Sequence, residues 1–319
     1  MSAEHPLVAL TGATGFIGRH LLAELPRAGV RVRALLRRPA ELPPETSGAV
    51  VGDLTQPRDM AAALRGVDAV VHSAGLAHAM SGRPEDDYRA LNTEATTALA
   101  RAAERAGVRR FVFLSSIRAQ VGPSAPHPVT DDDPPAPTDA YGRSKLDAER
   151  ALADLGLDWV ALRPVVVYGA GAKGNVAALL AAARSSLPLP LGSLTGRRSL
   201  VSAGALADAV ALVLRAPGDL RRSFIVAEPE APTVAAMIAA LRTGLGRGPG
   251  LLPVPAGLIG LGARLVGRGE AFERLAGSLV ARAEGLEALG WRPRTTTAEG
   301  LAAYAKGALP SPVWDRGRG

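Results

Sequence analysis

The stretch Leu7-Val-Ala-Leu-Thr-Gly-Ala-Thr-Gly-Phe-Ile-Gly18 decides the fold. An apolar run that is typical of a buried strand ends in three glycines spaced three apart, and a helix-compatible segment follows over residues 16–25. Glycines at such a turn let the backbone approach a pyrophosphate closely, and the N-terminus of the helix offers unpaired N–H groups to the anion. We favour a dinucleotide site over a purely structural glycine turn, because a strand and a helix flank the glycines.

The composition excludes several classes of protein. The 319 residues suffice for a large core, and the absence of cysteine excludes disulfides, thiolate metal sites and cysteine nucleophiles. The five histidines lack a metal-binding spacing, so no metal is expected. A net charge of +7 can indicate nucleic acid, but the arginines are scattered and aromatic residues make up only 4%. We therefore expect no nucleic-acid partner.

Two apolar segments bear on localisation. The first one leads straight into the glycine turn after a polar start, so no signal peptide is expected. The second, residues 254–266, is interrupted by glycines and Arg264 and is shorter than the roughly 20 apolar residues that span a bilayer. We interpret it as a buried helix and predict a soluble, cytoplasmic protein with no membrane partner.

Strand-like and helical patterns alternate over the first half of the chain, which predicts an α/β fold with a Rossmann-type, doubly wound parallel sheet. The proline-rich segment 123–137 predicts a surface loop. After residue 165 short helices follow glycines and prolines, which indicates a smaller C-terminal α/β substrate lobe. The expected division is 1–165 for the NAD(P)-binding domain, 166–315 for a substrate-binding lobe interleaved with it, and 316–319 for a tail. Strands are expected at 30–36, 49–51, 69–72, 110–114 and 159–162, and helices at 58–64, 87–106, 140–155, 175–183, 205–214 and 234–241.

The segment Tyr141-Gly-Arg-Ser-Lys145 carries the clearest chemical signal. Tyr141 and Lys145 share one helical face, and a nearby ammonium lowers the pKa of a phenol, so that the tyrosine can exchange a proton with an alcohol or ketone. By itself this spacing is common, and a packed tyrosine with a solvated lysine would be the better interpretation. Ser115 and Ser116 change that balance, because they follow a strand at the sheet edge where ligands bind and can hold the reacting oxygen.

At this point the chain resembles the extended short-chain dehydrogenase/reductases, the NAD-dependent epimerase/dehydratase family. The shared motifs are the glycine turn, Gly52-Asp-Leu54, Leu114-Ser-Ser-Ile117, the Tyr141/Lys145 pair and Leu162-Arg-Pro-Val-Val-Val-Tyr-Gly169. Within the family the chain is most similar to the UDP-glucose/UDP-galactose 4-epimerases and the related 4-keto-sugar reductases. The resemblance implies a homodimer through a pair of helices, 87–106 and 140–155, with Asn92 bracing the central helix.

The resemblance also implies roles for particular residues. Ser116, Tyr141 and Lys145 would be catalytic, and Asn175 and Arg198 would bind the substrate diphosphate, with Ser115 and Ser116 also touching substrate. For Asn175 a helix cap is an alternative, and for Arg198 a solvated loop charge. No metal ligand is implied. The residues expected to bind the cofactor are Gly12, Thr14, Gly15, Phe16, Ile17, Gly18, Arg37, Arg38, Asp53, Leu54, His72, Ala74, Gly75, Tyr141, Lys145 and Pro164.

Two departures from the family pattern affect the expected ligands. Relatives carry an acidic residue soon after Arg198, whereas residues 201–206 have none. An NAD-selective site places Asp or Glu after the second strand, whereas this chain has Arg37 and Arg38 there, which can pair with a 2′-phosphate. Among NAD(P)(H) cofactors the chain is therefore expected to prefer NADP(H), the alternative being that both arginines are simply exposed.

Four functions follow from these expectations, in order of preference. The first is a nucleotide-sugar epimerase that transfers a hydride at C4 of a UDP-hexose, with Tyr141 as acid/base. The second is an NADPH-dependent reductase of a nucleotide 4-keto sugar. The third is a dehydrogenase or reductase of the hydroxysteroid or flavonoid type, which has no need of Asn175 or Arg198. The last is a non-catalytic NADP(H)-binding sensor or assembly protein, since fold alone does not fix function.

Overall fold

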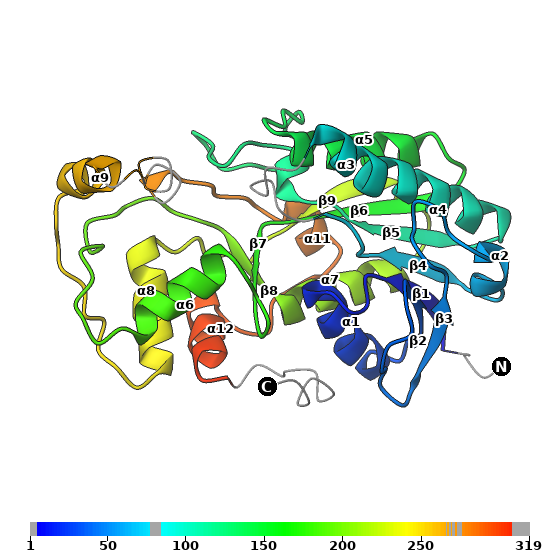
Figure 1. The fold of residues 1–319 in the computed structure, drawn as a ribbon, viewed down its shortest axis with the longest axis horizontal. Helices are drawn as coiled ribbons and strands as arrows, with labels where there is room; N and C mark the ends of the chain where they lie inside the picture. Colours follow the sequence, from blue (N-terminus) through cyan, green and yellow to red (C-terminus); the bar gives the residue numbers. More distant parts are fainter. Residues whose placement is uncertain are drawn as a thin grey trace.

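The computed structural model describes residues 5–76, 84–265, 267, 269, 272 and 276–307. Its centre is a seven-stranded sheet in the order β3-β2-β1-β4-β5-β6-β9, and all neighbouring strands in it run parallel (Figure 1). The predicted doubly wound fold is thus confirmed, while the expected tail at 316–319 lies outside the described residues. The strands are β1 (Leu7–Thr11), β2 (Arg31–Leu36), β3 (Thr46–Val50), β4 (Ala69–His72), β5 (Arg110–Leu114), β6 (Asp158–Pro164) and β9 (Arg222–Val226).

Helices cover both faces of the sheet and bury its central strands (Figure 1). One layer holds α1 (Phe16–Arg27) and α7 (Ala203–Arg215), whose apolar faces form one core cluster with the strands. The opposite layer holds α2 (Met60–Ala63), α4 (Ala95–Arg105) and α5 (Ala140–Ala153). The two apolar layers explain why strands such as β4 and β5 are apolar without alternation.

The helix expected at 87–106 is one continuous run with a change of winding in its first half. It comprises α3 (Glu85–Tyr88), the π-helix η1 (Arg89–Glu94) and α4. A π-helical turn is uncommon and often marks a functional site. Here it places Asn92, fully buried, against α5.

The rest of the chain forms a smaller lobe on the carboxyl side of the sheet (Figure 1). It has its own apolar core and a two-stranded parallel sheet, β7 (Val166–Tyr168) and β8 (Leu200–Ser202). The chain then returns to the main sheet as α7 and β9, neither of which the sequence analysis placed there. The remaining helices are η2 (Ile117–Ala119), α6 (Asn175–Arg184), α8 (Val234–Gly244), α9 (Ala256–Leu265), α11 (Glu284–Ala288) and α12 (Thr297–Ala305).

Helix α9 contradicts one sequence-based expectation. The apolar segment 254–266 was expected to be a buried helix, but the side chains of Leu258, Leu261 and Leu265 are 62%, 59% and 80% exposed. Only the opposite side of the helix is packed, where Gly260 lies against the ring of Phe272. Within the described ranges, no helix combines the length and the apolar character needed to cross a membrane.

Candidate functional site

The glycine turn joins β1 to α1 at the carboxyl edge of the sheet. Gly12 has φ +68°, and a Cβ there would lie 2.7 Å from the backbone nitrogen of Ala74. A Cβ on Gly18 would overlap the carbonyl oxygen of Gly12, while the Gly15 N–H donates to that same oxygen at 2.9 Å. Thr14 and Gly15 are exposed beside the N-terminus of α1. The turn is therefore a side-chain-free cradle, and it fits a pyrophosphate held by backbone N–H groups.

A directional chain of hydrogen bonds runs under this cradle. Thr11 and His72 are register partners at the ends of β1 and β4, and Thr11 Oγ1 lies 2.7 Å from His72 Nδ1. On the other side of the ring, His72 Nε2 lies 2.9 Å from Thr96 Oγ1, whose hydroxyl donates to the Asn92 carbonyl. Because Thr96 has already used its proton, Nε2–H must be the donor and Nδ1 the acceptor of the Thr11 hydroxyl proton.

His72 is therefore a neutral residue inside the protein. It is 0% exposed, and its burial lowers its pKa to about 3, with a smaller contribution from the charge of Lys145. The ring also stacks on Phe113 with a centroid separation of 5.8 Å. Both ring nitrogens bond to protein groups, so His72 positions the segment of Ala74 and Gly75 rather than presenting a free polar atom to a ligand.

Asn92 ties three segments together behind the site. Its amide accepts from the Leu76 N–H at 2.8 Å and donates to the Leu76 carbonyl at 3.2 Å. The same NH₂ donates to Ser144 on α5 at 3.0 Å. A Cβ on Gly75 would lie 2.8 Å from the Asn92 oxygen and 3.3 Å from Lys145 Nζ, so a side chain at Gly75 would displace both.

Ser116, Tyr141 and Lys145 come together where β5 ends and α5 begins. Tyr141 and Lys145 are both buried, and the Ser116 side chain is close enough to the Tyr141 hydroxyl to lower its pKa. Lys145 Nζ donates to the Leu114 carbonyl at 2.9 Å and lies 4.5 Å from the centre of the Phe113 ring. A phenol, a hydroxyl and an ammonium converging at a sheet edge can hold an oxygen atom and move its proton.

The pKa of Tyr141 differs from the expectation. Burial raises it above the ordinary value near 10, and the hydrogen bond from Ser116 and the charge of Arg118 offset this only in part. The ammonium of Lys145 is not among the groups that lower it. The pKa of Lys145 itself falls to about 8, because burial disfavours the charged form.

Ser115 is not brought to Tyr141. Its hydroxyl bonds instead to the carboxylate of Glu149, which is buried and also accepts from Ser223 at 3.0 Å. Arg163 completes this network, with Nε 3.1 Å from the Glu149 carboxylate and Nη1 3.0 Å from Gln120 Oε1. Ser115 thus belongs to a buried structural network with Arg163 of β6 and Ser223 of β9, although it is the direct neighbour of Ser116 in the chain.

Arg118 is a candidate residue that the sequence analysis missed. Its guanidinium pairs with Asp139, whose carboxylate also caps α5 by accepting the Gly142 N–H at 2.7 Å. Its charge lowers the pKa of both Tyr141 and Arg198, so the three groups are close in space. Nothing in the loop sequence distinguished Arg118 from other surface arginines.

The two residues expected at the substrate diphosphate lie in the smaller lobe. Arg198 is half-buried and donates to the carbonyls of Pro123 at 3.1 Å and Gly277 at 3.2 Å, so it is not a solvated loop charge. Asn175 is exposed as the first residue of α6, whose N-cap is Gly174, so it is not the helix cap. For both residues the alternative interpretation is thus removed, and binding of the substrate diphosphate stays a prediction.

The expected adenine side lies after β2 and β3. Arg37 and Arg38 are exposed where β2 ends. The Asp53 carboxylate accepts from the Thr55 N–H at 2.9 Å and hydroxyl at 2.8 Å, and these bonds, with the charge of Arg37, lower its pKa. The other expected cofactor residues on this edge are Phe16 and Ile17 in α1, Leu54 after β3 and Pro164, which is buried at the end of β6.

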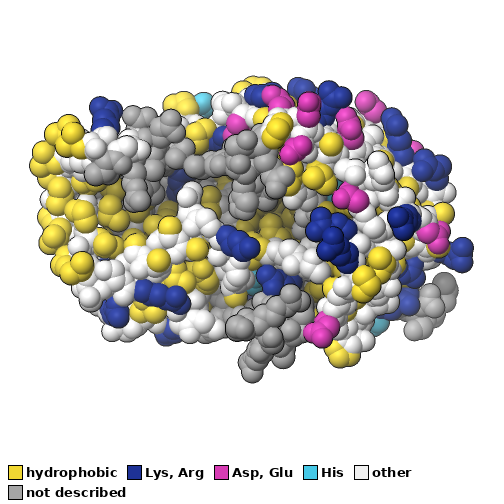
Figure 2. Space-filling model, viewed as in Figure 1, with side chains coloured by type: hydrophobic (Ala, Val, Ile, Leu, Met, Phe, Trp, Pro, Cys, Tyr) yellow, Lys and Arg dark blue, Asp and Glu magenta, His cyan; other side chains and the backbone are white. Residues whose placement is uncertain are grey.

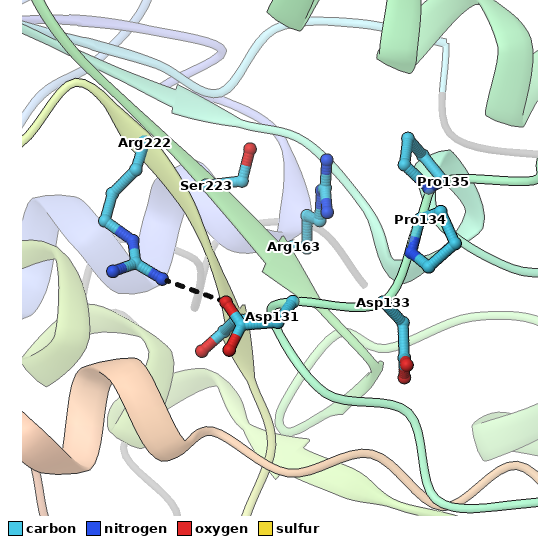
Figure 3. Close-up of a pocket in the computed structure, with 8 residues that line it drawn as sticks. Asp131, Asp133, Pro134, Pro135, Arg163, Arg222 and Ser223 are labelled. Carbon is cyan, nitrogen blue, oxygen red and sulfur yellow. Dashed lines mark ion pairs between the residues drawn. The ribbon is translucent and has the colours of Figure 1, made fainter.

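A cavity of about 450 Å³ lies elsewhere, between the proline-rich loop and the outer strands (Figure 3). It is lined by Asp131–Asp133 of the loop, Arg163 of β6, and Arg222 and Ser223 of β9. None of the residues expected to bind cofactor or substrate lines it. Its Arg163 and Ser223 are bonded to Glu149, and Arg222 is 4.0 Å from Asp132. We therefore locate the candidate site at the glycine cradle and Tyr141.

Comparisons with known proteins agree with this geometry. The model of the NAD dependent epimerase/dehydratase family matches residues 8–227. The UDP-glucose 4-epimerase of Vibrio cholerae is 34% identical, and the match covers 95% of each chain. The solved structure of MoeE5 in complex with UDP-glucose and NAD is 29% identical, with a TM-score of 0.71 and coverage of 94% of this chain and 98% of that one. A 3-beta-hydroxysteroid dehydrogenase of Mycolicibacterium neoaurum is 31% identical over 51% of this chain and 48% of its own.

Proposed function

Because this chain belongs to the NAD dependent epimerase/dehydratase family, we propose that it is an NAD(P)-dependent epimerase acting at C4 of a UDP-hexose. The observation that carries the proposal is the cluster of Ser116, Tyr141 and Lys145 at the same sheet edge as the glycine cradle. The near-full-length similarity to a UDP-glucose 4-epimerase supports the sugar class. In this proposal residues 1–165 bind the dinucleotide and the lobe within 166–315 binds the sugar nucleotide.

The proposed mechanism assigns one task to each side chain. Ser116 binds the reacting oxygen beside the Tyr141 hydroxyl, and Tyr141 takes the proton of the sugar hydroxyl and later returns it. Lys145, whose Nζ is held by the Leu114 carbonyl beside Tyr141, binds the ribose of the nicotinamide half of the cofactor. A bound nicotinamide would supply the hydride-accepting and hydride-donating chemistry at C4. Burial of Tyr141 and Lys145 keeps water from competing for the proton.

Charged groups beside Tyr141 suit a diphosphate. Arg198 and Arg118 are close enough for the charge of Arg118 to lower the pKa of Arg198, so positive charge gathers beside Tyr141. Guanidinium groups bind phosphate oxygens through paired N–H donors. We assign Arg198, with Asn175 at the start of α6, to the substrate diphosphate.

The proposed cofactor preference is NADP(H). Arg37 and Arg38 are exposed at the end of β2, the place where an NAD-selective site carries a carboxylate. Comparing the dissociation constants of NAD⁺ and NADP⁺ for the purified protein tests this. Tighter binding of NAD⁺ would refute the preference and leave the epimerase proposal standing.

A second function is favoured by one observation. The raised pKa of Tyr141 keeps the phenol protonated at neutral pH, and a protonated phenol is ready to donate to a ketone oxygen. This is the first step that an NADPH-dependent reductase of a nucleotide 4-keto sugar requires. The proposed preference for NADP(H) agrees with it.

One incubation distinguishes these functions. Purified protein is mixed with UDP-glucose or UDP-galactose, with and without NADPH, and the sugars are separated after hydrolysis. Interconversion without net oxidation of NADPH supports the epimerase, and stoichiometric loss of NADPH with a 4-keto sugar supports the reductase. Tyr141→Phe should abolish either activity and leave dinucleotide binding intact. Binding of NADP(H) with no turnover of sugar nucleotide, keto sugar or sterol would refute both functions.

The hydroxysteroid alternative has its own control. It needs no diphosphate site, so Arg198→Met should leave steroid oxidation unchanged but raise the KM for a UDP-hexose. The proposed homodimer through α4 and α5 is tested by sedimentation velocity of the same preparation.

A further inference from the structure

The end of the smaller lobe carries an unusual concentration of exposed leucine. Six large hydrophobic side chains stand out as exposed among the described residues, and five of them lie in this lobe. We call these five the distal leucine surface. It consists of Leu187, Leu252, Leu258, Leu261 and Leu265.

The geometry of α9 turns three of these residues into one ridge. Leu258, Leu261 and Leu265 are spaced three and four apart, so they share one face of the helix. Gly260 is on the opposite face and packs against Phe272, which fixes the leucine face outward. α9 lies at the outer end of the lobe, away from the main sheet (Figure 1).

The other two leucines are held in adjoining loops. Leu189 and Leu251 pair as neighbouring backbone segments, with the Leu252 N–H donating to the Leu189 carbonyl at 2.8 Å. The buried Arg242 donates to the carbonyls of Leu187 and Gly250, which locks the two loops together. Leu187 and Leu252 are thus displayed by a rigid framework rather than by a loose loop.

The two segments that frame this surface are basic. Residues 171–207 and 231–265 contain seven Lys and Arg and no Asp or Glu. On the face shown in Figure 2, acidic side chains gather over the cofactor-binding half, while hydrophobic and basic side chains occupy the end that carries α9. An apolar helix face flanked by these basic segments is complementary to an anionic lipid surface.

We propose that the distal leucine surface docks this protein peripherally on an anionic lipid membrane. The leucine ridge of α9 enters the headgroup boundary, and the exposed side chains of Arg184, Arg247 and Arg264 face the lipid phosphates. A second copy of this chain would be a poor occupant, because it would bring the same positive charge to the contact. Nucleic acid would leave the leucines in water. The proposal concerns surface attachment and is independent of which sugar the site accepts.

Sedimentation with lipid vesicles tests the proposal on the full-length protein. The vesicles are phosphatidylcholine with or without phosphatidylglycerol, at low and at high salt. We expect binding to the anionic vesicles that weakens with salt, because screening shortens the range of the attraction. The double variant Leu258→Ser/Leu261→Ser should lower the partition constant by at least about tenfold, because two apolar contacts are lost.

A matched control is Val50→Ser, which removes the remaining exposed hydrophobic side chain, 55% exposed at the end of β3 in the other half of the protein. It should bind vesicles like the wild type. Circular dichroism and turnover should be unchanged in both variants, which shows that they are folded. The proposal would be overturned if the wild type did not bind the anionic vesicles, or if the leucine variant bound them as strongly as the wild type. So would a change of oligomeric state in the leucine variant without vesicle binding, since the surface would then be a contact between copies.

Discussion

Replacing His72 by Gln should remove a large part of the acid sensitivity of this protein. The ring is completely buried and neutral, accepts a proton from Thr11 and donates one to Thr96. Protonation of Nδ1 would set two donors against each other, since the Thr11 hydroxyl already accepts from the Ala74 N–H. The folded state therefore resists the second proton that the unfolded chain accepts readily.

The magnitude follows from the two pKa values. The pKa of His72 is about 3 in the folded protein, against about 6.5 in the unfolded chain. Between these values the unfolded state binds more protons, so the contribution is fully present above pH 6.5 and is lost as the pH falls. From pH 7 to pH 5 the loss is about 2 kcal/mol, because each pH unit below 6.5 costs about 1.4 kcal/mol.

The assay is urea unfolding at pH 7, 6 and 5, followed by circular dichroism. Gln keeps one donor and one acceptor but cannot be protonated, so His72→Gln should be less stable at pH 7 and lose about 2 kcal/mol less than the wild type on going to pH 5. His127→Gln replaces an exposed histidine and should keep the wild-type dependence. Parallel pH profiles for the wild type and His72→Gln would show that the buried ring is not the acid-sensitive group.

Three further predictions concern other parts of the structure. Gly18→Ala should abolish dinucleotide binding, measured by calorimetry, because the added Cβ would overlap the Gly12 carbonyl. The control Gly204→Ala places its Cβ in open space, so it should keep binding and add up to about 1 kcal/mol of helix stability. The kcat/KM should fall as the pH rises through about 8, where Lys145 loses its charge; a profile flat to pH 9 would contradict this. Arg110→Met should cost about 3–5 kcal/mol in urea unfolding by leaving Asp158 buried and unpaired, and adding Asp158→Leu should recover part of that loss.

Most of the cofactor half was predictable because local patterns determine it. A glycine turn between strand and helix has few alternatives, and apolar runs separated by helices lead to a parallel sheet. β9 was missed because Arg222–Val226 is short and begins at the second of two arginines. Its identity as a strand comes from pairing with β6, more than fifty residues earlier.

The candidate site shows the same division between local and distant causes. The positions of Tyr141 and Lys145 follow from helical spacing. Glu149, held by Arg163, accepts the hydrogen bond of the Ser115 hydroxyl, so Ser116 is the serine that is left beside Tyr141. The same apolar helical pattern occurs in helices buried in a core and in helices with an exposed apolar face. The exposure of α9 could therefore not be predicted from the sequence.

The hydrogen bonds that anchor the proline-rich loop affect the order in which the newly synthesised chain can fold. Asp131 accepts from the Ile225 N–H at 2.6 Å and from the Gly285 N–H at 2.9 Å, the latter 154 residues further along the chain. At a ribosomal rate of about 5–20 residues per second, roughly 8–30 s separate the synthesis of Asp131 from that of its second partner. Until β9 follows, β6 is an open edge, and until Gly285 follows, the loop before α5 lacks its second anchor. The nascent chain thus completes its nucleotide cradle long before the loop that precedes Tyr141 is fully anchored, and a chaperone has most to protect between those two moments.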